Sequence, residues 1–183
     1  SNTDGSVTSS VSANADYGFS IVTYSATGSD LTVGHGLGKK PALIILKSRN
    51  VSGDWLVMHN SSEPNKFLKL NTNEAQADAS NVFTSVTDSV FGTGNDSGIN
   101  SSGQNKVAYC FANVPGYQRI GSYVGNGSST GPVIVTGFKP RFILLRSTSG
   151  SRGWLIYDTE RDTNSTNDNC LFPHTAGSES SDS

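Results

Sequence analysis

The residue types that could do acid, base or nucleophilic chemistry are few and scattered. The chain has 3 histidines, His35, His59 and His174, among many serines. Nucleophilic catalysis needs a Ser or Cys beside a His that a carboxylate orients. No known signature of that kind surrounds any of the three histidines. We therefore expect no catalytic nucleophile and no enzyme, and hydrolase activity is the weaker hypothesis.

The densest acidic group is formed by Asp158, Glu160 and Asp162. Paired carboxylates can cleave a glycosidic bond, and because their spacing is spatial the sequence alone does not exclude such a pair. The surrounding stretch DTERDTNSTNDN, residues 158–169, also carries oxygen-bearing side chains at alternate positions, as calcium loops do. It lacks the Gly at the sixth position and the Glu at the twelfth that an EF-hand loop requires. We predict a solvated loop tip, with calcium binding as the alternative.

The glycine-rich stretch GHGLGKKP, residues 34–41, superficially resembles a phosphate-binding loop. It lacks the Lys-Ser/Thr ending, and no helix follows to bind phosphate at its N-terminus. His35 within it corresponds to Ile134 in the repeat described next. We therefore predict a turn or core-edge role for His35.

Part of the sequence is repeated at a fixed offset of 99 positions. Residues 21–60 align without a gap on residues 120–159, and the identical pairs include Tyr24 with Tyr123 and Trp55-Leu56 with Trp154-Leu155. Conservative pairs such as Lys47 with Arg146 support the same register. This pattern indicates a tandem repeat of about 99 residues. We predict domain boundaries at 1–16 for an N-terminal linker or edge strand, 17–115 for the first copy and 116–183 for an incomplete second copy.

The second copy contains only about two thirds of a unit. The start at Ser1 and the single methionine, Met58, indicate a fragment or processed piece of a longer protein. The missing closing strands could come from further residues of the protein, from residues 1–16, or from a neighbouring chain. An incomplete sheet has open edges that favour pairing.

Each copy is predicted to be β structure. Both copies contain segments rich in β-branched and aromatic residues, separated by Gly-containing turns. Only residues 73–80, NEAQADAS, have helical composition. The paired tryptophans are predicted to lie in the core of their units, although exposed rings could stack on sugars. We predict an all-β fold of antiparallel β-sandwich units in tandem, jelly-roll or lectin-like. The predicted strands are 19–25, 42–48, 66–72, 119–125 and 141–147, together with DWLVMHN, GWLIYDT, NVFTSVTDSVFGTG and NKVAYCFANV.

Composition restricts the partners. Charged residues make up 15% of the chain and its net charge is −2, so we expect no nucleic-acid partner. The sequence contains no run of 18 apolar residues, so we predict no membrane span. Cys110 and Cys170 belong to no Cys-x-x-Cys or Cys/His cluster, so we predict free thiols rather than a disulfide, and no metal or cofactor.

Several segments resemble a repeat of bacteriophage tail and virion structural proteins, especially marine and cyanobacterial phages. They are GFSIVTY, VGHGLGKKPALIILKSR, DWLVMHNSS, VAYCFANVPGY, GSYVGNGS, GPVIVTGFKPRFILLR and GWLIYDTERD, covering residues 17 to about 172. The unit also resembles the small lectin-type sandwiches that cap phage fibres. The resemblance implies localisation in the virion as a fibre or tail-tip component, commonly a trimer, that contacts other virion proteins. It also implies a further glycine-turn segment and final strand after CLFPHTAGSES.

The leading hypothesis is therefore a non-enzymatic phage fibre or tail domain that recognises host surface glycan through loops at one end of its sandwiches. The ligand-binding residues are not predicted. A purely architectural virion protein, such as a capsid decoration or fibre shaft, is the alternative. A polysaccharide-depolymerising tailspike is the third hypothesis.

Overall fold

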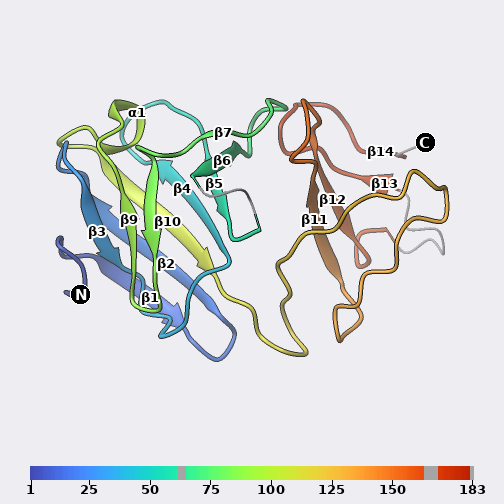
Figure 1. The fold of residues 1–183 in the computed structure, drawn as a ribbon, viewed down its shortest axis with the longest axis horizontal. Helices are drawn as coiled ribbons and strands as arrows, with labels where there is room; N and C mark the ends of the chain where they lie inside the picture. Colours follow the sequence, from blue (N-terminus) through green and yellow to red (C-terminus); the bar gives the residue numbers. More distant parts are fainter. Residues whose placement is uncertain (62–64, 163–168, 182–183) are drawn as a thin grey trace.

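A computed structural model describes residues 1–61, 65–162 and 169–181, and these form an all-β fold with antiparallel sheets and one short helix. Figure 1 shows β1 to β10 in one body and β11 to β14 beside it. The elements are β1 (Ser10–Asn14), β2 (Phe19–Ser25), β3 (Leu31–Gly34), β4 (Leu43–Ser48), β5 (Leu56–His59), β6 (Lys66–Lys69), β7 (Ala77–Asp78), β8 (Phe83–Val86), β9 (Val90–Thr93), α1 (Ser97–Asn100), β10 (Asn105–Phe111), β11 (Phe142–Arg146), β12 (Trp154–Asp158), β13 (Asn169–Cys170) and β14 (Ser180–Ser181).

The main sheet has seven strands in the order β1-β2-β10-β4-β5-β6-β7. Strand β10 lies at its centre, paired with β2 on one side and β4 on the other. Alternate residues of β10 are buried because successive side chains of a strand point to opposite faces. Ala108 and Cys110 face the core, where they belong to one cluster with Val22 of β2 and Ile44 of β4.

A second sheet, β3-β9-β8, shares a core with the main sheet. Val33 and Phe91 of this sheet and Ile44 of the main sheet belong to one cluster of buried side chains. The ring of Phe91 meets Tyr24 edge-on, with centroids 6.0 Å apart. The first copy is therefore two sheet layers around one apolar interior.

The two copies contain the same hairpin. In β4–β5, Leu43 pairs with His59 and Leu46 with Leu56, and in β11–β12, Phe142 pairs with Asp158 and Leu145 with Leu155. Every pair of the first hairpin recurs in the second at the offset of 99. The cation–π contact recurs as well: Lys47 lies 5.7 Å from the Trp55 ring centroid, and Arg146 lies 5.8 Å from that of Trp154.

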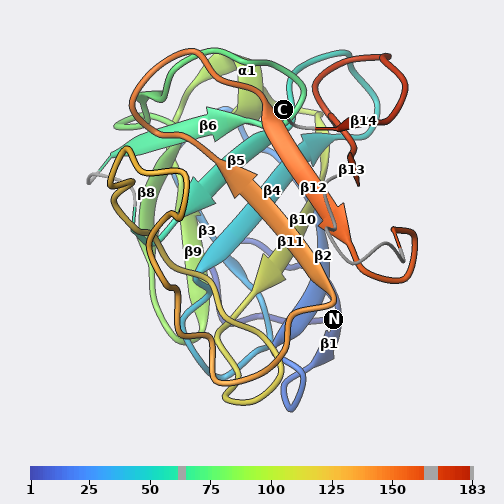
Figure 2. The same cartoon turned by 90° about the vertical axis from the view of Figure 1, so that its right-hand side faces the viewer.

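The two hairpins pack on each other through corresponding faces, and β11–β12 crosses in front of β4 and β5 in Figure 2. Trp154, 4% exposed, packs with Val57 and Leu68 of the first copy. Its indole Nε1 donates a 2.7 Å hydrogen bond to the carbonyl oxygen of Lys69. Strand β4 is buried on the face toward the main core, where Ile44 lies, and half-buried on the other face, where Ile45 packs against this cluster. The expectation that residues 42–48 and 141–147 are strands buried on both faces is wrong for β11, in which Phe142 and Ile143 are exposed. Trp154 is a core residue, but it joins the two copies instead of filling the interior of its own unit.

Trp55 differs from its counterpart in burial. Its half-buried ring stacks on Tyr109, with centroids 6.3 Å apart and an interplanar angle of 24°. Because the ring is half-buried on the outside of the main sheet, the prediction that Trp55 lies in the core of its unit is wrong.

The rest of the second copy departs from the predicted strands. Residues 119–125 form no strand, although their counterpart in the first copy is β2. Strand β2 is held by β1 and β10, and residues 1–183 contain no counterpart of β10 at the offset of 99. The backbone groups of a strand need a neighbouring strand to pair with. Strand-forming composition alone therefore does not make residues 119–125 a strand.

Two further expectations are corrected or clarified by the pairing. Residues 73–80 form no helix; Ala77 and Asp78 instead form β7, which pairs with β6. Residues 1–16 do not complete the second copy, because β1 pairs with β2 of the first copy. Cys110 and Cys170 lie in different sheets and are not bonded to each other.

Candidate functional site

Four strand ends meet at one edge of the main sheet. The register pairs Phe111 with Phe19 and with Leu43, and Leu43 in turn pairs with His59. Strands β2 and β4 therefore begin, and strands β5 and β10 end, at the same end of the main sheet. The loop residues just beyond these ends come from distant parts of the sequence and are brought together here.

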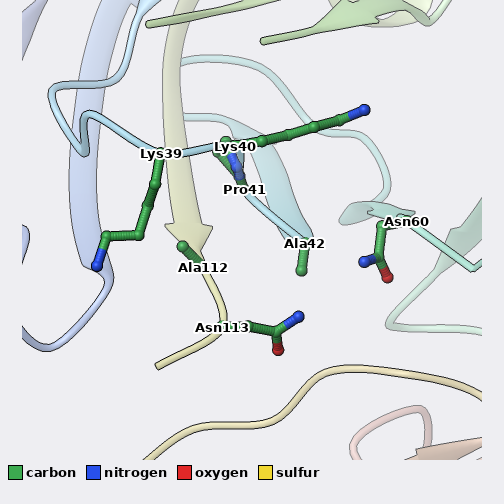
Figure 3. Close-up of a pocket in the computed structure, with 7 residues that line it drawn as sticks. All are labelled: Lys39, Lys40, Pro41, Ala42, Asn60, Ala112 and Asn113. Atoms are coloured by element: carbon green, nitrogen blue, oxygen red, sulfur yellow. The ribbon is translucent and has the colours of Figure 1, made fainter. Parts of the chain in front are cut away.

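This edge contains a pocket of about 360 Å³, which is within the size range of small-ligand sites. We call it the Lys39–Asn113 pocket. Figure 3 shows the side chains of Asn60 and Asn113 directed into the space beside Ala42, while the Lys39 and Lys40 ammonium groups extend in different directions. Its lining residues are Lys39, Lys40, Pro41, Ala42, Asn60, Ala112 and Asn113.

The two amides of the pocket are oriented by their own hydrogen bonds. The Oδ1 of Asn113 accepts a 2.6 Å hydrogen bond from the backbone N–H of Ile120. The Oδ1 of Asn60 accepts one of 3.2 Å from the Ser61 hydroxyl. With both oxygens engaged, the amide NH₂ groups are the donors available to a ligand. The pocket thus suits ligands rich in acceptor oxygens, such as hydroxyl and carboxylate groups.

Two exposed tyrosines lie at the same edge. Tyr17 precedes β2 and Tyr117 follows β10, and their rings lie 4.9 Å apart at 57°. They are 54% and 55% exposed. The Nε2 of Gln118 holds the turn that carries Tyr117 by donating a 2.7 Å hydrogen bond to the carbonyl oxygen of Ala112. Exposed aromatic faces are a surface on which a sugar ring could stack.

His35 is a buried structural residue, in agreement with the role predicted for it. Its Nε2 lies 3.2 Å from the Thr87 carbonyl oxygen, and its Nδ1 accepts a 3.2 Å hydrogen bond from the Leu37 backbone N–H. A neutral ring that donates from Nε2 satisfies both contacts. Burial lowers the pKa of His35 below its usual 6.5. The glycine-rich stretch thus turns around an uncharged histidine and brings Lys39 and Lys40 to the pocket.

A pH titration tests this role of His35. Because its folded-state pKa is lowered, the unfolded chain binds the proton more tightly, and stability falls as pH drops below about 6.5. Between about pH 7.5 and pH 5 we therefore expect the free energy of unfolding to fall, and to fall less in His35→Gln than in the wild type. Urea unfolding of wild type and His35→Gln measures the difference. Burial also lowers the pKa of His59, so His59→Gln is measured in parallel. An unchanged pH dependence in His35→Gln would contradict a neutral buried imidazole.

The other histidines make local contacts. The Nδ1 of His59 accepts a 3.0 Å hydrogen bond from the backbone N–H of Ser61, and that of His174 accepts one of 3.2 Å from Trp154. Neither contact is the Ser-to-His hydrogen bond that activates a nucleophile.

The acidic group at the tip of the second hairpin is engaged locally. Asp158 Oδ1 accepts from the backbone N–H of Glu160 at 2.9 Å, and Glu160 pairs with Arg141 at 3.1 Å. Asp162 is buried, and its Oδ2 accepts a 2.9 Å hydrogen bond from the backbone N–H of Asn169. The calcium alternative rests on 158–169, of which residues 163–168 lie outside the described part of the chain.

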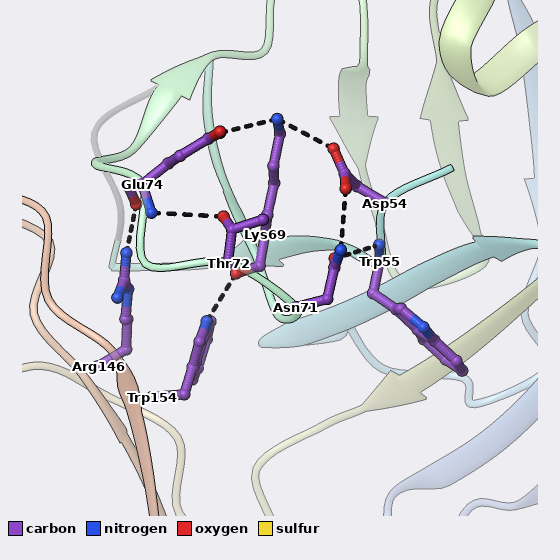
Figure 4. Close-up of polar contacts among 8 residues, drawn as sticks. All are labelled: Asp54, Trp55, Lys69, Asn71, Thr72, Glu74, Arg146 and Trp154. Atoms are coloured by element: carbon purple, nitrogen blue, oxygen red, sulfur yellow. Dashed lines mark hydrogen bonds and ion pairs between the residues drawn. The ribbon is translucent and has the colours of Figure 1, made fainter. Parts of the chain in front are cut away.

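A second polar cluster joins the two copies (Figure 4). Lys69 Nζ lies 2.9 Å from an Asp54 carboxylate oxygen and 2.8 Å from one of Glu74. The Arg146 guanidinium donates to the carbonyl oxygen of Glu74. Since one lysine lies between both carboxylates and the second hairpin bonds to the same turn, we assign this cluster a structural role.

Of the pocket residues, only Lys39, Lys40 and Pro41 belong to a stretch that the sequence singled out. Asn60, Asn113, Tyr17 and Tyr117 are common types in this chain, and only their positions next to strand ends distinguish them. These residues lie at the same end of the sheet only because of how strands that are distant in sequence pair, and the sequence alone does not give that pairing.

Within the described ranges, no group of three or more His, Cys, Asp or Glu side chains could hold a metal ion. The described helix is too short to cross a membrane.

Comparison with known proteins gives one match. A family model described as a domain of unknown function (DUF7483) matches residues 1–183. No curated protein and no solved structure matches the chain.

Proposed function

Because this chain belongs to the DUF7483 family, a domain of unknown function, we propose its role from the surface that its residues build. It is a non-enzymatic domain of a phage tail fibre or tail tip, and it binds host surface polysaccharide at the Lys39–Asn113 pocket. The observation that carries this proposal is the pair of amide donors, Asn60 and Asn113, in one pocket at the end of the main sheet. The exposed pair Tyr17 and Tyr117 belongs to loops at the same end of the sheet.

The chemistry of the pocket favours a sugar over a phosphate. A phosphate site needs converging cations or a row of backbone N–H groups. The ammonium groups of Lys39 and Lys40 extend apart, whereas the amides of Asn60 and Asn113 face one space (Figure 3). Sugar hydroxyls accept hydrogen bonds from such amides, and the apolar face of a sugar ring packs on tyrosine. Two lysines nearby also favour carboxylated sugars over amino sugars.

The remaining parts of the proposal come from the sequence. The resemblance to phage repeats supports a position in the virion, contacts with other virion proteins, and assembly as a trimer. The identical hairpins support two sandwich units in tandem, jelly-roll or lectin-like, of which the first has both layers.

Glycan-array binding and competition with phage adsorption to host cells test the proposal. We expect saturable binding of an oligosaccharide by the wild type, and a dissociation constant raised about tenfold by Asn60→Ala and by Tyr117→Ala, since each removes roughly 1 to 1.5 kcal/mol of contact. Tyr123→Ala is the matched control, because Tyr123 is also exposed but lies in the second copy.

Three outcomes would contradict the proposal. Absence of saturable binding would favour an architectural virion protein. Shortened polysaccharide chains after incubation would favour a depolymerase. An equal loss of affinity in Tyr123→Ala would place the binding surface elsewhere.

A further inference from the structure

His59, the last residue of β5, makes two hydrogen bonds beside the Lys39–Asn113 pocket. Its Nδ1 accepts a 3.0 Å hydrogen bond from the backbone N–H of Ser61, in the loop that carries Asn60. The ring also hydrogen-bonds the backbone of Gly121. Because Nδ1 is already an acceptor, Nε2–H donates to the carbonyl oxygen of Gly121. The two contacts together require a neutral ring that is protonated at Nε2.

The residues that this ring contacts belong to the two segments that orient the pocket amides. The Ser61 hydroxyl donates a 3.2 Å hydrogen bond to Oδ1 of Asn60. Ile120, the neighbour of Gly121, donates its backbone N–H to Oδ1 of Asn113 at 2.6 Å. One imidazole thus connects the loop of Asn60 with the segment that orients Asn113.

Burial, and not a neighbouring charge, determines the protonation of His59. The charged side chains on the elements next to it are Lys39 and Lys40 of the pocket, Lys66 of β6, Asp78 of β7, and Arg119 before Ile120. Glu63 lies outside the described residues. Burial lowers the pKa of His59 below its usual 6.5, the bond to Gly121 opposes that shift, and none of the described charged groups contributes. The ring is therefore neutral at about pH 7.5 and gains its second proton only at acidic pH.

We propose that His59 is a positioning residue whose protonation state sets the orientation of both pocket amides, and thereby the affinity of the pocket for its ligand. The neutral ring holds the Ser61 loop and the Gly121 segment together. Protonation of Nδ1 removes the acceptor of the Ser61 N–H and leaves two donors facing each other, so this contact is lost. Affinity for an uncharged sugar therefore falls at acidic pH. The identity of the ligand rests on the proposed function, whereas the coupling of His59 to the two amides does not.

A pH titration of the ligand-free protein by two-dimensional NMR tests this coupling. The ring signals of His59 give its titration midpoint, and the side-chain amide signals of Asn60 and Asn113 are followed from about pH 8 to about pH 5. We expect both amides to shift with the midpoint of His59, and this transition to disappear in His59→Gln. His174→Gln is the matched control, because its Nδ1 also accepts a backbone N–H but it lies in the second copy, and it should keep the transition. The wild-type titration alone decides the coupling if His59→Gln does not fold.

Calorimetric titration with an uncharged oligosaccharide of the host surface polysaccharide tests the consequence for binding. We expect the dissociation constant of the wild type to rise about fivefold between about pH 7.5 and about pH 5, since one oriented amide contact is lost. In His59→Gln it should be nearly constant over the same range. The probe is uncharged because the added positive charge of His59 would attract a carboxylated sugar and obscure the loss.

The two measurements separate the role of His59 from the identity of the ligand. Amide signals of Asn60 and Asn113 that do not follow the titration of His59 would overturn that role, even if the sugar binds. Binding by the wild type that is independent of pH, or equally dependent on pH in His59→Gln, would overturn it as well. Absence of binding at both pH values, with amides that follow His59, would support the coupling and contradict only the glycan proposal.

Discussion

Replacing Trp154 by alanine is expected to lower the free energy of unfolding by about 3 to 5 kcal/mol, as for other large buried aromatic residues. The indole is buried between the copies, and it packs on Val57 and Leu68 of the first hairpin. Its removal also leaves the carbonyl oxygen of Lys69 without the indole N–H donor. Urea unfolding followed by circular dichroism measures the loss.

Trp55→Ala is the matched control for this prediction, because it removes the same side chain from the equivalent position. Trp55 is half-buried on the outer face, where it stacks on Tyr109, so we expect a smaller loss of about 1 to 2 kcal/mol. Equal losses for the two variants would show that Trp154 does not join the copies.

The second large effect is expected for Phe91→Ala, which should cost about 3 to 5 kcal/mol of unfolding free energy. Phe91 is fully buried between the two sheet layers of the first copy and contacts Tyr24 edge-on. The cavity left by its ring would be enclosed by both layers. Thermal and urea unfolding both measure this loss.

Phe142→Ala provides the comparison in the second copy. Phe142 lies on β11 and is 57% exposed, so we expect a change within about 0.5 kcal/mol. A large loss in Phe142→Ala would mean that β11 is covered in solution. A small loss in Phe91→Ala would contradict a shared core between the two sheets.

Much of the fold was predictable because its information is local. The β-branched and aromatic residues of FSIVTYS and NKVAYCFANV predicted β2 and β10, and the offset of 99 predicted that the second hairpin repeats the first. The apolar segment ALIILKS predicted a buried strand, and β4 is buried on its inner face and half-buried on its outer face.

The secondary-structure expectations that were wrong concern segments whose structure depends on pairing with a strand elsewhere in the sequence. Residues 119–125 have the composition of a strand, yet a strand forms only when another strand pairs with it. Residues 73–80 have helical composition but only about two turns of length, which is too short for a stable isolated helix. Pairing with β6 determines the structure there instead.

The candidate site was less predictable than the fold. Asn60 and Asn113 are separated by more than half of the first copy in sequence and meet only because β5 and β10 end in the same row of the sheet. His35 and Asp162, which the sequence analysis considered as possible catalytic or calcium-binding residues, are buried and hydrogen-bonded to backbone groups.

Two-dimensional NMR of the intact protein, titrated with oligosaccharides of host surface polysaccharide, tests the proposed binding site most directly. We predict saturable shifts of the side-chain amide signals of Asn60 and Asn113. Because the proposed domain is not an enzyme, the oligosaccharide should have the same length after the titration as before it. Saturable shifts confined to other residues, or no shifts at all, would contradict recognition at the Lys39–Asn113 pocket.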